Sequence, residues 1–121
     1  MRDEGLYLDD ILEAAESIKQ FTGNLKKEDF LESDLVQSAI LQKLTVIGEA
    51  AARITEETRS SYPQIQWRSI TGLRNIAVHV YYTVDWNMIW EIVQSNIPQL
   101  KTQIAEIIAK DFPLPDGSES D

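Results

Sequence analysis

The stretch RNIAVHVYY, residues 74–82, holds the only histidine of the chain beside an arginine, an asparagine and two tyrosines. On an α-helix, Asn75 and His79 lie four residues apart on one face, where their side chains can touch. The asparagine carbonyl can then fix the imidazole tautomer, and its amide can bind phosphate. Arg74 lies at the edge of this face, about 100° around the helix axis. The spacing therefore predicts a polar strip of three residues, with Tyr81 just past the helix end.

These side-chain types suit the cleavage of RNA without a metal ion. A histidine takes the proton from the 2′-hydroxyl group or gives one to the leaving oxygen. An arginine stabilises the charge on the phosphate as it becomes pentacoordinate. Because this reaction needs a base and an acid, we expect a two-fold homodimer that brings a second His79 to a shared cleft. The alternative is that His79 only interacts favourably with the dipole at a helix C-terminus.

The positive charge gathers in the middle of the chain. The net charge is −9, but residues 36–82 hold five basic and three acidic side chains, and four of the five are arginine. The planar guanidinium group suits phosphate better than a point charge does. This middle third is therefore the part that best tolerates RNA, although phosphates repel an acidic protein overall. A chance distribution of a few charges is the alternative interpretation.

The composition excludes several classes of site. With no cysteine, the chain has no disulfide, no thiolate nucleophile and no cysteine metal site. One histidine also excludes a histidine-rich metal site within one chain, and we expect no cofactor. No apolar run is long enough to span a membrane, and the acidic N-terminus MRDEGLYLDD has no signal-peptide core. We therefore expect one cytoplasmic domain.

Helical periodicity dominates the whole sequence, and no alternating strand pattern competes with it. Residues 55–63 predict either the fraying end of a long helix or a short extra helix that Pro63 closes. Ser33 or Asp34 can cap the long helix, and Gly23 is a natural stop for the helix before it. The expected helices are residues 6–21, a short turn at 26–33, a long helix at 34–54, then 67–79 and 86–107.

Pro98 lies inside the last of these helices. The apolar stripe resumes in phase after it, which favours a kink over a stop. The end of the chain, FPLPDGSESD, has two prolines followed by small and acidic residues, which are typical of disorder. The pattern predicts an all-α, up-and-down bundle of about four main helices at residues 1–110, with a disordered acidic tail at 111–121.

The motif and three longer segments resemble one family. RNIAVHVYY resembles the R-x4-H-x-Y signature of the HepT family, within the HEPN superfamily of all-helical ribonuclease domains. The resemblance covers about residues 5–108 and implies a HEPN-like bundle. The segments that extend it are LTVIGEAAARI at 44–54, YPQIQWRSITGLRN at 62–75 and DWNMIWEIVQSNIPQLKTQI at 85–104.

The resemblance implies the toxin of a type VII-like toxin–antitoxin pair, whose partner is a small MNT-type nucleotidyltransferase. In such pairs the toxin is a dimeric ribonuclease, and the partner transfers AMP from ATP to the motif tyrosine. By position, Arg74 and His79 take the catalytic roles and Asn75 the polar position beside the arginine. Tyr81 takes the position of the modified tyrosine.

Two features complicate the assignment of the acceptor tyrosine. Tyr82 follows Tyr81 directly, so either phenol is a candidate for AMPylation. Val80 stands where family members commonly have glycine, and it is bulkier and stiffer. A nucleotidyl group two residues from His79 would block the cleft and repel the phosphates of RNA.

Glu49 and Arg53 are possible supporting residues with two interpretations. They are four apart in the favourable order for an ion pair within one helix. The functional interpretation is that Glu49 orients Arg74 across the bundle. Arg68 is expected to be a solvated cation, although it could approach RNA.

The sequence leaves two functions open. The first is a ribonuclease toxin that AMPylation of Tyr81 neutralises. The second is a non-catalytic helical module that docks a nucleotidyltransferase or binds a nucleotide, with Arg74 and His79 as phosphate contacts. The histidine–tyrosine spacing favours the first, because a binding module has no need for it. The acidic charge of the chain mildly favours the second.

Overall fold

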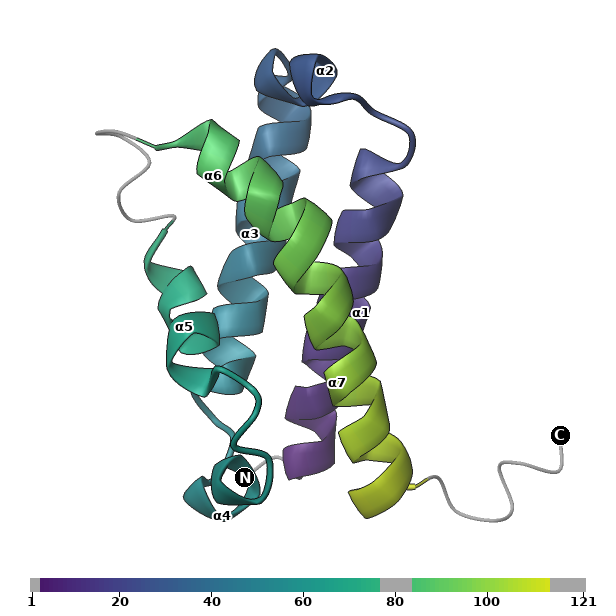
Figure 1. Ribbon diagram of the computed structural model, residues 1–121, viewed down its shortest axis with the longest axis vertical. Helices are drawn as coiled ribbons and strands as arrows, with labels where there is room; N and C mark the ends of the chain where they lie inside the picture. Colours follow the sequence, from purple (N-terminus) through teal and green to yellow (C-terminus); the bar gives the residue numbers. More distant parts are fainter. Residues whose placement is uncertain (1–2, 77–83, 114–121) are drawn as a thin grey trace, which may run out of the picture.

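A computed structural model describes residues 3–76 and 84–113. Within these ranges the chain forms helices and turns, with no β-strand. The long helices α1 (Glu4–Thr22), α3 (Asp34–Ala51) and α7 (Ile97–Asp111) run side by side (Figure 1). The shorter helices α2 (Lys27–Leu31), α4 (Glu56–Ser61), α5 (Trp67–Gly72) and α6 (Trp86–Glu91) connect and cover them. The all-α, up-and-down bundle predicted from periodicity is confirmed.

Helix α1 forms where the apolar residues recur at helical spacing. Leu8, Ile11 and Ile18 are fully or almost fully buried, while the acidic residues Asp9 and Glu13 on the opposite side are exposed. The helix ends where Gly23 adopts a positive φ of 46° and its N–H donates to the carbonyl of Lys19. Glycine reaches this backbone conformation at no steric cost, so the predicted stop is confirmed.

Side-chain caps define the start of α3 and the short helix after it. Ser33 is the cap of α3, because its Oγ accepts from the N–H of Val36 at 3.1 Å. Of the two interpretations of residues 55–63, the short extra helix is the right one. Helix α4 begins after Thr55, whose Oγ1 accepts from the N–H of Thr58 at 3.2 Å.

The last helix changes its hydrogen-bond register before Pro98. A π-helical turn, Ile92–Asn96, separates α6 from α7, and the N–H of Ile97 donates to the carbonyl of Ile92. Proline has no N–H to donate and its ring clashes with the preceding turn, so a wider turn accommodates it. The expected kink is therefore found, and the run from α6 to α7 crosses from α3 toward α1 (Figure 1).

Helix α7 extends slightly past the predicted domain boundary at residue 110. It reaches Asp111, whose carboxylate accepts from the Tyr62 hydroxyl at 2.6 Å, and Phe112 packs against the core beside Gly5. The predicted tail beyond residue 113 lies outside the described residues. Within the described ranges, no helix has both the length and the apolar character needed to cross a bilayer.

Candidate functional site

The segment that carries Arg74 is a helix followed by a tighter turn. Helix α5 ends at Gly72, and a 3₁₀ turn, Leu73–Asn75, continues the chain. The prediction of one regular α-helix over 67–79 is therefore wrong at this point, because the tighter i to i+3 turn common at helix ends intervenes. His79, Val80, Tyr81 and Tyr82 lie outside the described residues. Whether Asn75 and His79 share a face thus stays a prediction.

Arg74 sits directly on helix α3 at Gly48. A Cβ atom built on Gly48 would lie 2.4 Å from the backbone nitrogen of Arg74 and 2.8 Å from its Cβ. Gly48 itself is buried, whereas Arg74 and Asn75 are exposed. The backbone of the turn is thus pressed against the bundle, while its polar residues face solvent.

Apolar neighbours hold this turn in place. Leu73 and Ile76, which flank Arg74 and Asn75, are half-buried and pack against the core. Trp67 at the start of α5 is buried, and its indole Nε1 donates to the carbonyl of Tyr62 at 3.1 Å. Both ends of the α5 segment are therefore anchored, which restricts where Arg74 leaves the surface.

Arg59 of α4 joins α5 to the C-terminal end of α3. Its guanidinium donates to the carbonyl of Ala51 at 2.7 Å and to that of Ile54 at 3.2 Å. It also reaches the hydroxyl of Thr71 at 3.4 Å, and it lies 6.0 Å from the Trp67 ring. A cation at a helix C-terminus satisfies the last carbonyls and interacts favourably with the dipole. No helical periodicity marks Arg59 in the sequence, so its role becomes visible only in the fold.

The structure does not show the polar contacts expected of Glu49 with Arg53 and Arg74. Among the described residues, Glu49 forms no hydrogen bond or ion pair with Arg53 or Arg74. Regular α3 ends at Ala51, so Arg53 lies in the turn beyond it and the helical i to i+4 geometry is lost. Both expected contacts of Glu49 are therefore missing, and any supporting role of the two residues stays a prediction.

Glu49 and Arg53 instead line a groove on another side of α3. This groove has a volume of about 600 Å³ and is shared with Tyr7 and Asp10 of α1. Gly48 and Glu49 are consecutive, so they point about 100° apart around the helix. One face of α3 thus receives Arg74, and the neighbouring face opens toward α1.

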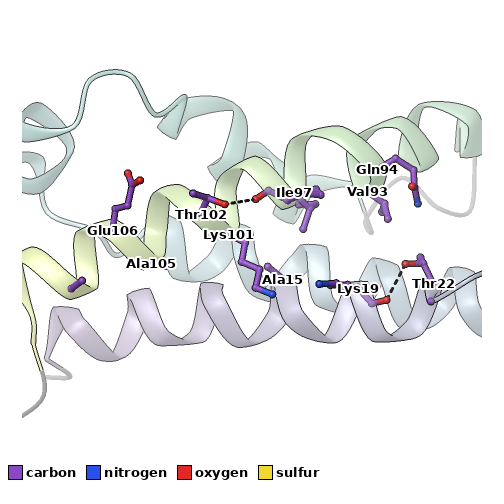
Figure 2. A pocket seen from close by; sticks show the side chains of 13 residues that line it. Ala15, Lys19, Thr22, Val93, Gln94, Ile97, Lys101, Thr102, Ala105 and Glu106 are labelled. Atoms are coloured by element: carbon purple, nitrogen blue, oxygen red, sulfur yellow. Dashed lines mark hydrogen bonds between the residues drawn. The ribbon is translucent and has the colours of Figure 1, made fainter. Parts of the chain in front are cut away.

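Another groove lies on the side of α1 that faces α7. It has a volume of about 670 Å³ and runs between α1 and α7, where Lys101 reaches across toward Ala15 (Figure 2). Lys101 forms an ion pair with Glu16, which lowers the pKa of that carboxyl below its usual value. None of Arg74, Asn75, Glu49 or Arg53 lines this groove.

Acidic side chains do not converge on a metal site in the part of the chain that the structure describes. There, no group of three or more histidine, cysteine, aspartate or glutamate residues is placed to hold a metal ion. His79 is outside this part, so its own surroundings are not included. In the described part of the site, the groups available for chemistry are those of an exposed arginine and an exposed asparagine on an anchored turn.

Comparison with known proteins identifies the family. The model of the family described as "Ribonuclease HepT-like" matches residues 11–107. The chain belongs to the HepT-like ribonuclease family. The match includes α3, α5 and the Arg74 turn, so the family resemblance seen in the sequence is confirmed.

Named relatives agree with this membership. A protein of Thermococcus cleftensis named "Probable ribonuclease HepT" is 37% identical over 101 residues, which cover 84% of this chain and 92% of the relative. A protein of Methanocaldococcus jannaschii named "Putative RNase MJ1380" is 33% identical over 103 residues, covering 85% and 94%. No solved structure matches the chain.

Proposed function

We propose that this chain is a ribonuclease toxin that cleaves RNA without a metal ion, using Arg74 and His79. The observation that carries the proposal is the Arg74 turn. Its backbone packs against Gly48 while the arginine itself is exposed, in a chain of the HepT-like ribonuclease family. Preorganised positive charge at a surface is what a phosphate needs as it gains charge in the transition state.

The proposed reaction needs two proton transfers. His79 takes the proton from a 2′-hydroxyl, and the 2′-oxygen attacks the adjacent phosphorus. The bond to the 5′-oxygen breaks, and that oxygen receives a proton from a second imidazole. Arg74 donates hydrogen bonds to the phosphate oxygens throughout, and Asn75 is placed to contact the same group.

Because one chain has one histidine, the proposal includes a homodimer in which two copies of His79 serve one cleft. Sedimentation of the purified chain tests this point. A chain that is monomeric at concentrations where it cleaves RNA would contradict the shared cleft.

The proposal also includes a partner. An MNT-type nucleotidyltransferase would transfer AMP from ATP to Tyr81 and release pyrophosphate. The added phosphate lies two residues from His79, where it would repel RNA and fill the cleft. In this pair, the chain is the toxin and the nucleotidyltransferase is its antitoxin.

The acidic charge of the chain supports one alternative. With a net charge of −9, the chain repels RNA at long range, as expected of a helical module that binds a protein or a nucleotide instead. In that case Arg74 and His79 serve only as phosphate contacts. Expression of the chain without its partner distinguishes the two, because only the ribonuclease arrests growth in a manner that depends on His79.

Arg74→Ala tests the role of the arginine most simply. We expect kcat for RNA cleavage to fall about 100- to 1,000-fold, the usual cost of removing a group that stabilises transition-state charge. Arg68→Ala is the matched control, since Arg68 is an exposed arginine on α5 of the same segment. Equal cleavage by the Arg74 variant and the control would remove Arg74 from the mechanism.

A further inference from the structure

Helix α3 and the Arg74 turn approach each other closely at Gly48. A side-chain Cβ there would meet three atoms of one residue, namely the nitrogen of Arg74 at 2.4 Å, its Cβ at 2.8 Å and its Cα at 3.0 Å. Two of these are backbone atoms, so no change of side-chain rotamer could make room. Even alanine would therefore push the Arg74 backbone away from α3.

The usual reason for a glycine does not apply here. Among the described residues, Gly23 alone has a positive φ, so Gly48 has an ordinary helical backbone that any residue could adopt. Glycine in the interior of a helix is unfavourable for the helix itself. The absent side chain is thus explained by the backbone that lies against it and not by the helix.

The surrounding contacts fix this arrangement. Ile47 and Ala51 beside Gly48 are fully buried, and Leu73 and Ile76 on either side of Arg74 and Asn75 pack on the same core. The turn cannot move outward without exposing these apolar side chains.

We propose that Gly48 is a positioning residue for Arg74. By lacking a side chain, it lets the Arg74 backbone rest directly on α3 and so sets where the guanidinium leaves the surface. The consequence for catalysis rests on the proposed function, in which that guanidinium stabilises the phosphate. A displacement of about 1 Å at such a group can cost 100-fold in rate.

Gly48→Ala tests this, with Gly72→Ala as the matched control. A Cβ on Gly72 would meet nothing within 4 Å, although Gly72 lies two residues before Arg74. Crystal structures of both variants should show Arg74 displaced from α3 by about 1 Å in the first, the shift needed to restore van der Waals contact, and unmoved in the second. We expect kcat to fall about 100-fold for Gly48→Ala, with KM little changed, and no loss for Gly72→Ala.

The outcomes separate this proposal from the proposed function. If the wild type cleaves no RNA but Arg74 shifts in Gly48→Ala, the function fails while the structural role of Gly48 stands. An unmoved Arg74 in Gly48→Ala would overturn the positioning role whatever the activity. A displaced Arg74 with an unchanged kcat in an active enzyme would also overturn the positioning role.

Thermal stability keeps the proposal testable if Gly48→Ala does not fold well enough to crystallise. In the interior of a helix, replacing glycine with alanine is favourable for the helix itself. A clash with the Arg74 backbone therefore predicts that Gly48→Ala lowers the midpoint of thermal unfolding or abolishes the cooperative transition, whereas Gly72→Ala does neither. A Gly48→Ala chain at least as stable as the wild type would overturn the direct contact between residues 48 and 74.

Discussion

Arg74 is held at its backbone and exposed at its side chain, which is the arrangement that a phosphate-binding arginine needs. Gly48 and the half-buried Leu73 restrict the turn, so the arginine side chain extends from a backbone that is held in place. Less conformational freedom is then lost when it binds the reacting phosphate. Arginine in this place also offers two parallel hydrogen bonds, which lysine does not.

The motif ends in two adjacent phenols, and we expect only the first to accept AMP. With ATP and the cognate nucleotidyltransferase, Tyr81→Phe should abolish the mass increase of the chain, because phenylalanine has no oxygen to bond the phosphate. Tyr82→Phe is the matched control and should gain mass as the wild type does. Intact-mass spectrometry measures both, and a modified Tyr81→Phe chain would move the acceptor site to Tyr82.

Helices α3, α4 and α5 form the frame behind the site, and Arg59 is its main polar link. It donates to the carbonyl of Ala51, the last residue of α3, and to that of Ile54 in the turn beyond it, and its bond to Thr71 reaches α5. Hydrogen bonds from a charged group inside such a frame contribute more to stability than neutral ones do. The frame therefore depends on one side chain of a six-residue helix.

Arg59→Ala should lower the free energy of unfolding by about 2 kcal/mol, because it removes the charge-assisted hydrogen bonds to the carbonyls of Ala51 and Ile54. Urea unfolding followed by circular dichroism measures this. Arg53→Ala is the control, since Arg53 is an exposed arginine near the same helix end. Similar stabilities of the two variants would show that Arg59 does not hold this frame together.

The elements with strong periodicity were predictable, and those set by tertiary contact were not. Helices α1 and α3 follow from their apolar stripes, and the cap and stop at Ser33 and Gly23 follow from local chemistry. The end of α5 at Gly72 did not follow, because the turn after it is shaped by packing on α3. The π turn was anticipated only as a kink, since its register depends on how Pro98 fits the neighbouring helices.

The candidate site also contains residues that the sequence identifies and residues whose role only the folded chain reveals. The sequence alone marks Arg74 and Asn75 as candidates by residue type, while the polar strip that they would form with His79 stays a prediction. The role of Gly48 does not follow from spacing, because residues 48 and 74 meet only in the folded chain. Its one local signal is a glycine in the interior of a helix, a place where alanine would cost less. Glu49 is the opposite case. Its spacing to Arg53 in the sequence favours an ion pair, but the structure shows none between these two residues.

The molecule as a whole is acidic, with its arginines concentrated in the middle third of the chain. A ribonuclease with this distribution should bind RNA through a limited basic region and repel it elsewhere. Two copies around a two-fold axis would bring two such regions and two His79 residues to one cleft. The acidic remainder is then available for contacts that do not involve RNA.

RNA cleavage in the presence of EDTA tests the central claim most directly. The measurement compares wild type with His79→Ala, using protein whose intact mass shows that Tyr81 is unmodified. Metal-independent catalysis by His79 predicts cleavage by the wild type and a loss of about 100- to 10,000-fold in the variant, the usual contribution of an acid–base group. Equal rates for the two proteins, or cleavage that EDTA abolishes, would contradict it.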